Sequence, residues 1–112
     1  MSRRPVVRYG NAAKPKQREA DFQSDVLELL TLTGWKHHHE TDSRKTAAGW
    51  PDIFACHPSR GVFWAELKVG RNKPSDAQWA WLNALEVAGE RAFVWRPESW
   101  DEIVRVAQGL DR

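Results

Sequence analysis

The fold is decided by the stretch Gly49-Trp50-Pro51-Asp52-Ile53-Phe54-Ala55-Cys56 and, after a short connection at residues 58–61, by Val62-Phe63-Trp64-Ala65-Glu66-Leu67-Lys68. Both runs are rich in β-branched and aromatic residues and are bounded by Gly and Pro. This pattern predicts two strands, at residues 52–56 and 62–68. Because the connection between them is so short, we expect the two strands to form a hairpin.

The segments on either side of this hairpin predict helices and two further strands. Apolar residues recur at helical spacing over residues 17–33, and a possible strand follows at residues 35–40. Ser75 and Gln78 have capping-box spacing and open a helix that ends near Gly89. A strand at residues 92–95 precedes a last helix, for which Ser99 and Glu102 form a second capping box. The order α-β-β-β-α-β-α predicts an α/β domain with a mixed sheet flanked by helices.

Charge divides the chain into a basic N-terminal arm, residues 1–16, and a domain at residues 17–112. Residues 1–18 contain six basic residues and no acidic one, whereas the rest of the chain has 11 basic and 15 acidic residues. Such an arm suits contact with a phosphate backbone, although a solvated tail explains the pattern equally well. The single cysteine cannot form an intramolecular disulfide, and no stretch is long and apolar enough to span a membrane. We therefore expect an intracellular protein of the cytoplasm, or of the host cytoplasm if a phage encodes it.

Three charged side chains stand at the ends of the hairpin strands. Side chains alternate along a strand, so Glu66 and Lys68 share one face near the end of their strand. Asp52 heads its strand directly after a turn, although Asp is a poor strand former. Two carboxylates on adjacent strands can hold a hard cation such as Mg²⁺, and a nearby lysine can then assist hydrolysis. Taken alone, Glu66 and Lys68 are better explained by a surface ion pair, and Asp52 by a capped turn.

The combination Glu19, Gly49-Trp50-Pro51-Asp52, Glu66-Leu67-Lys68 and Gln78 resembles the PD-(D/E)xK nuclease superfamily. Within it the chain is most similar to the VRR-NUC family, whose small stand-alone members are common in phages. The resemblance covers roughly residues 17–107. It implies a restriction-endonuclease-like core with Asp52 and Glu66 as ligands of Mg²⁺ or Mn²⁺ and Lys68 as the catalytic lysine.

The same resemblance implies less central roles for three further groups. The backbone carbonyl of Leu67 would be another metal ligand, and Glu19 an additional ligand or a water-mediated partner. From its position on the first helix alone, Glu19 lies either in water at the frayed end or turned inward toward a cation. Gln78 would act at the edge of the site near the water or the DNA backbone, while the capping box offers a competing explanation for it.

Basic and aromatic residues around these motifs are the expected DNA contacts. We expect the backbone to be held by Arg3, Arg4, Arg8, Lys14, Lys16, Arg18, Arg44, Lys45, Arg71 and Lys73. Trp50 would either wall the site or stack on nucleic acid. Trp35, Trp79, Trp81 and Trp95 are expected in the core or at a subunit interface. His37, His38 and His39 do not predict a structural zinc site, because such a site normally needs several cysteines.

The sequence thus predicts a hydrolase, a metal-dependent DNA endonuclease that acts in repair or recombination. One small domain offers one active site, and cutting two strands requires two, so we expect a homodimer. By the resemblance, branched or four-way-junction DNA is the expected substrate, with duplex DNA also a candidate partner; we expect no membrane partner and no small-molecule cofactor. Two alternatives remain open, a non-catalytic DNA-binding module and a nuclease subunit that requires a partner repair protein.

Overall fold

The computed structural model describes residues 17–41 and 47–110. The basic residues expected at positions 3, 4, 8, 14, 16, 44 and 45 lie outside these ranges. The elements, in chain order, are α1 (Glu19–Leu32), β1 (Lys36–His39), β2 (Ile53–His57), β3 (Gly61–Leu67), α2 (Asp76–Val87), β4 (Arg91–Trp95), η2 (Pro97–Ser99) and α3 (Trp100–Ala107). The predicted α-β-β-β-α-β-α order is confirmed, and the described residues add one element to it, the short 3₁₀ helix η2.

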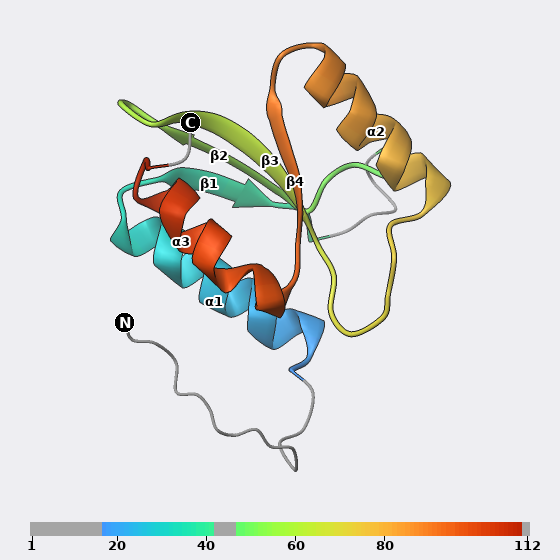
Figure 1. The fold of residues 1–112 in the computed structure, drawn as a ribbon, viewed down its shortest axis with the longest axis horizontal. Coiled ribbons are helices and arrows are strands. Elements are labelled where there is room, and N and C mark those ends of the chain that lie inside the picture. The colour runs from blue at the N-terminus through green and yellow to red at the C-terminus, as the bar shows by residue number, and fades with distance from the viewer. Residues whose placement is uncertain (1–16, 42–46, 111–112) are drawn as a thin grey trace.

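The four strands form one mixed sheet in the order β1-β2-β3-β4. β1 and β2 pair antiparallel, β2 and β3 form the predicted antiparallel hairpin, and β3 and β4 are parallel. The parallel pair follows from the crossover through α2, since a helix between two strands returns the chain in the same direction. Figure 1 shows the crossover, in which the chain leaves β3, passes through α2 and returns in β4.

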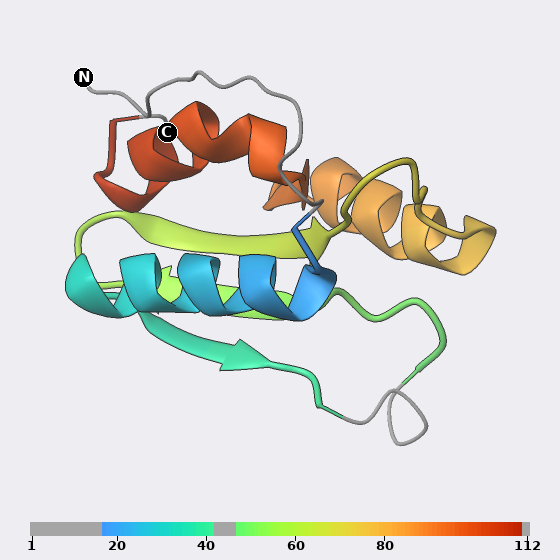
Figure 2. The same ribbon diagram turned by 90° about the horizontal axis from the view of Figure 1, so that it is seen from below.

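The hydrophobic core lies between one face of this sheet and the helices α1 and α3. Phe63, Ala65 and Leu67 alternate along β3 with side chains of the opposite face, and all three are buried. They belong to a core cluster with residues of α1 and α3 such as Phe22 and Ile103. Figure 2 shows α1 and α3 running along the strands. The period-2 pattern of β3 therefore matches a sheet with one face turned to the core.

The opposite face of the sheet is covered in part by α2. Trp64, which alternates with the core residues of β3, makes an edge-to-face contact with Trp50 at a centroid distance of 5.3 Å. Trp50 in turn contacts Trp81 of α2 at 4.9 Å. The helix thus packs over aromatic side chains that stand on the same face as Glu66.

The tryptophans predicted to be in the core or at an interface differ in exposure. Trp35 and Trp95 are core residues and Trp81 is half-buried, as expected for packing within the domain. Trp79 is 43% exposed, so it is not a core residue, and its place at an interface stays a prediction. None of the described helices is long and apolar enough to cross a membrane.

The second predicted capping box is wrong. The Ser99 side chain makes no capping hydrogen bond to α3. Its hydroxyl instead accepts a hydrogen bond from the backbone N–H of Arg96 at 3.2 Å. Pro97 has started the 3₁₀ turn η2 at this point, and that turn occupies the hydroxyl before the α-helix begins.

Candidate active site

Asp52 stands immediately before β2, on the turn that follows Pro51. Its Oδ2 accepts a hydrogen bond from the backbone N–H of Leu67 at 2.8 Å. The Asp52 backbone carbonyl accepts from the N–H of Glu40, which ties the turn to the end of β1 as well. The carboxylate is therefore held against the end of β3 at Leu67, the residue between Glu66 and Lys68.

Among the described residues, Glu66 is the one charged residue that is buried, with 2% of its surface exposed. Its Oε2 accepts a hydrogen bond from Gln78 Nε2 at 2.7 Å and lies 3.4 Å from Lys68 Nζ. Its Oε1 is buried and has no hydrogen-bond partner among the described residues. A buried oxygen without a partner costs free energy, so its persistence in a site of this kind needs a functional reason.

Burial dominates the electrostatics of Glu66. It raises the pKa of this carboxyl group to about 7, and the negative charge of Asp52 acts in the same direction. The ammonium of Lys68 opposes both effects. The two carboxyl groups thus stand close enough that a second negative charge is disfavoured unless a cation lies between or beside them.

Lys68 lies just past the end of β3, on the same face as Glu66. Its side chain is 15% exposed, and its backbone N–H donates to the carbonyl of Trp95 in the neighbouring strand. That backbone bond extends the parallel β3–β4 pairing by one residue and fixes the direction of the side chain. Asp52, Glu66 and Lys68 are therefore brought together, as their order in the sequence suggested.

Gln78 forms the predicted capping box and also contacts Glu66, while its role near the water or the DNA backbone stays a prediction. Its backbone N–H donates to Ser75 Oγ, and its side-chain Oε1 accepts from the backbone N–H of Ser75 at 2.8 Å. This is the predicted capping box of α2. The capping bond occupies the amide oxygen, so the amide nitrogen is left to donate to Glu66.

Sequence reasoning missed the contacts that hold the turn carrying Asp52 to α2. The indole N–H of Trp81 donates to the backbone carbonyl of Ala48 at 3.0 Å. Gly49, at φ +83°, lies so close to α2 that a Cβ there would be 2.3 Å from the carbonyl oxygen of Ala77. Only the Gly49-Trp50 turn itself hinted at these contacts, because Gly permits both the positive φ and the close approach.

Glu19 is exposed, at the first residue of α1. Within residues 17–41 and 47–110 there is no group of three or more His, Cys, Asp or Glu side chains placed to hold a metal ion. The carboxylate therefore stands at the helix end in water, and its role as an additional ligand stays a prediction. Trp50 is half-buried between Trp64 and Trp81, which suits a wall of the site.

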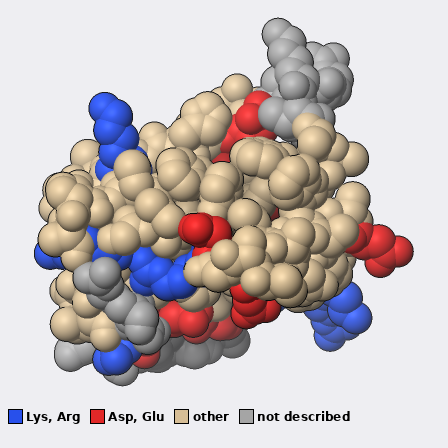
Figure 3. Space-filling view, turned by 90° about the horizontal axis from the view of Figure 1, so that it is seen from above, with Lys and Arg blue, Asp and Glu red and all other residues tan. Residues whose placement is uncertain are grey.

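The described basic residues expected to contact DNA lie at the surface. Arg71 and Lys73 are exposed in the loop before α2, and Arg18 is exposed at the start of α1, where it pairs with Asp21. Figure 3 shows acidic and basic side chains interspersed on one face, with no continuous basic strip among its described side chains. This charge pattern agrees with a body whose acidic residues outnumber its basic ones.

The donor set fits a hard divalent cation. Asp52 and Glu66 offer carboxylate oxygens, one of them the unpartnered Oε1, and the backbone carbonyl of Leu67 adjoins them in sequence. Mg²⁺ typically uses one or two carboxylates together with waters and substrate phosphates, so a cage of three protein carboxylates is not required. His37 bonds to Thr31 instead of joining a metal-binding group.

Comparison with known proteins supports the fold. No family model and no curated protein matches the chain. Among solved structures, one described as a "VRR_NUC domain protein" aligns with 84% of this chain and 88% of its own, with a TM-score of 0.62 and 19% identity. Hjc of Archaeoglobus fulgidus, a Holliday junction resolvase, aligns with 68% of this chain and 66% of its own, with a TM-score of 0.49 and 22% identity.

At these identities the first similarity establishes the fold, and the second is too weak to add to it. The predicted fold class, an α/β nuclease-like core with a mixed sheet and flanking helices, is confirmed. The chain has the fold of a VRR-NUC domain.

Proposed function

We propose that the chain is an endonuclease that hydrolyses DNA phosphodiester bonds with Mg²⁺ or Mn²⁺. The observation that carries the proposal is the meeting of Asp52, Glu66 and Lys68 at the ends of two paired strands, with Glu66 Oε1 buried and without a partner. A domain that only binds DNA gains nothing from a buried carboxylate beside a second one, because that arrangement lowers stability.

The metal would be held by the carboxylates of Asp52 and Glu66 and the backbone carbonyl of Leu67, with Glu19 as an additional or water-mediated ligand. When bound, such an ion lowers the pKa of water and polarises the phosphate. Asp52 is already oriented by its hydrogen bond from the Leu67 N–H, and Glu66 by its bond from Gln78. Both carboxylates therefore need little rearrangement to bind a cation.

Lys68 supplies a positive charge on the face where the scissile phosphate would lie. Its Nζ, 3.4 Å from Glu66 Oε2, can hold the attacking water and stabilise the charge that develops on the phosphate. Gln78 contributes by fixing Glu66, and its place at the start of α2 leaves it at the edge of the site.

DNA binding in this proposal rests on backbone contacts and not on base reading. The basic arm, together with Arg18, Arg44, Lys45, Arg71 and Lys73, would neutralise phosphates on either side of the site. Trp50 would close the site on the side of α2. Contacts of this kind recognise DNA shape, which fits the branched or four-way-junction substrate that the motif resemblance implies.

The proposed active form is a homodimer, since one domain presents one site and a junction has two strands to cut. Exposed apolar positions are available for such an interface, among them Trp79 at 43% and Val87 at 89% exposure. The proposed place of action is the cytoplasm. Light scattering at micromolar concentration gives the test, and a monomer that nevertheless cuts both strands of a junction would contradict the dimer.

The activity is tested with linear duplex, single-stranded and four-way-junction DNA in Mg²⁺, Mn²⁺ or EDTA. We expect metal-dependent cutting by the wild type and a loss of at least 100-fold in Lys68→Ala, an effect typical of losing a group that stabilises developing charge. Lys36→Ala, which removes an exposed lysine from β1, is the matched control and should cut normally. Cutting in EDTA, or full activity of Lys68→Ala, would refute the proposal, and tight binding without any cutting would favour a binding module or a partner-dependent subunit.

A further inference from the structure

The turn that carries Asp52 rests on α2 through its backbone. Gly49 approaches Ala77 so closely that any side chain would collide with the helix backbone, at 2.3 Å from the carbonyl oxygen and 2.7 Å from the N–H nitrogen of Gln78. Two residues later Pro51 is buried, and Asp52 follows directly. The position of the carboxylate along the strand end therefore depends on where this turn meets the helix.

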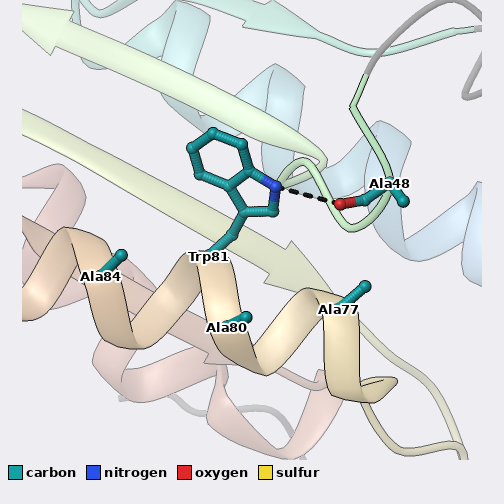
Figure 4. A pocket seen from close by; sticks show the side chains of 5 residues that line it. All are labelled: Ala48, Ala77, Ala80, Trp81 and Ala84. Atoms are coloured by element: carbon teal, nitrogen blue, oxygen red, sulfur yellow. Dashed lines mark hydrogen bonds between the residues drawn. The ribbon is translucent and has the colours of Figure 1, made fainter.

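The side chain of Trp81 ties the turn to the helix by a hydrogen bond. Trp81, one turn into α2, donates its indole N–H to the carbonyl of Ala48 at 3.0 Å, as Figure 4 shows. The same ring meets Trp50 edge-on at 4.9 Å, and Trp50 meets Trp64 of β3 at 5.3 Å. Trp81 and Trp50 thus join α2, the turn and β3. Ala48, which accepts the hydrogen bond, lies at the start of the turn, and Asp52 follows its end.

This hydrogen bond stands at the surface, where it contributes little to global stability. It borders an open groove of about 330 Å³ lined by Ala48, Ala77, Ala80, Trp81 and Ala84 (Figure 4). A solvent-accessible bond of this kind contributes little to folding, because water can replace it. It nevertheless holds the carbonyl of Ala48, four residues before Asp52, against α2.

We infer that Trp81 is a positioning residue for the metal-binding carboxylate of Asp52, an inference that rests on the proposed function. The same helix holds Glu66 through Gln78 at 2.7 Å. The first half of α2 therefore contacts the supports of both carboxylates, the turn before Asp52 through Trp81 and Glu66 through Gln78. Groups that hydrogen-bond directly to metal ligands affect metal affinity by about 10- to 100-fold, and Trp81, which acts through the turn, should have a smaller effect.

The test is the Mn²⁺ affinity of the full chain without DNA, measured by isothermal titration calorimetry. Trp81→Phe keeps an aromatic ring against Trp50 but removes the indole N–H that bonds to Ala48. Trp79→Phe is the matched control, because it makes the same change two residues away, on a side chain that is 43% exposed. Urea unfolding of each variant in EDTA monitors the fold.

We expect the dissociation constant for Mn²⁺ to rise up to about fivefold in Trp81→Phe and to stay within twofold of the wild type in Trp79→Phe. The Mn²⁺ concentration for half-maximal cleavage should rise by the same factor as the dissociation constant. The urea concentration at the midpoint of unfolding in EDTA should stay close to that of the wild type, because water can replace the exposed hydrogen bond.

Three other outcomes have distinct meanings. If the wild type binds Mn²⁺ and cuts DNA while Trp81→Phe matches it, the positioning role is refuted and the proposed function stands. If Trp81→Phe loses stability in EDTA but keeps its Mn²⁺ affinity, Trp81 is only a packing residue. If the wild type neither binds Mn²⁺ nor cuts, the proposed function fails, and with it the basis for assigning Trp81 a role.

Discussion

Replacing Glu66 with glutamine should stabilise the protein in the absence of metal. Glu66 is 2% exposed, its Oε1 has no partner among the described residues, and the charge of Asp52 is close by. Burial and that charge together raise the pKa of the Glu66 carboxyl group from 4.5 to about 7. A glutamine has nearly the same shape, can accept the same hydrogen bond from Gln78 and carries no charge.

The magnitude follows from the two pKa values. The unfolded chain releases the Glu66 proton near pH 4.5, whereas the folded protein retains it to about pH 7. Because the folded state binds this proton more tightly, the contribution of Glu66 to stability is most favourable below pH 4.5 and is lost as the pH rises to 7. At about 1.4 kcal/mol for each pH unit, the whole loss is about 3 kcal/mol.

The assay is urea unfolding in EDTA at pH 5 and pH 8, followed by the fluorescence of buried tryptophans such as Trp95. The stability of Glu66→Gln relative to the wild type should increase by about 2 kcal/mol or more between these two pH values. Groups that titrate alike in both proteins cancel in this difference. Glu86→Gln, at an exposed position of α2, is the control and should show no such increase.

The reasoning is refuted if the difference between Glu66→Gln and the wild type is the same at pH 5 and pH 8. In that case Glu66 would be either hydrated or fully compensated by Lys68 in the folded protein. The stabilised variant should also fail to cut DNA in Mg²⁺ or Mn²⁺, because it lacks one of the two proposed ligands.

Two further predictions concern the turn before Asp52 and the N-terminal arm. Gly49→Ala should destabilise the protein by about 2 kcal/mol more than Gly89→Ala, by urea unfolding, because both positions have positive φ but only Gly49 faces the carbonyl of Ala77. Equal costs would show that the turn can move away from α2. Removing residues 1–16 takes away five basic residues and should reduce the slope of log affinity against log salt for duplex DNA by up to about 4. An unchanged slope would mean that the arm does not contact phosphates.

The parts of the site that the sequence predicted are those fixed by local rules. Alternation along β3 placed Glu66 and Lys68 on one face, and the turn at Pro51 placed Asp52 at the head of β2. The distance between Asp52 and Glu66 in the fold then follows from a hairpin, whose register is set by a short connection. Each step uses neighbours in sequence or one tight turn, so the pattern alone was sufficient.

Local rules failed where two of them competed for the same side chain. Ser99 has the spacing of an N-cap for α3, yet Pro97 begins a 3₁₀ turn that uses the Ser99 hydroxyl first. The position of Glu19 could not be decided for a related reason. Helical spacing puts it on the apolar side of α1, but the first residue of a helix is free to extend into water, and it does so here.

The contacts of Trp81 and Gln78 show what the sequence could not provide. Trp81 bonds to a carbonyl 33 residues away, and backbone carbonyls leave no trace in the amino-acid pattern. Gln78 was explained completely by its capping box with Ser75, so nothing in the sequence required a second partner. In the fold the capping bond is what directs the amide nitrogen to Glu66, and the local and distant roles depend on each other. A change at Ser75 should therefore affect Glu66 as well as the start of α2, although the two residues lie on different elements.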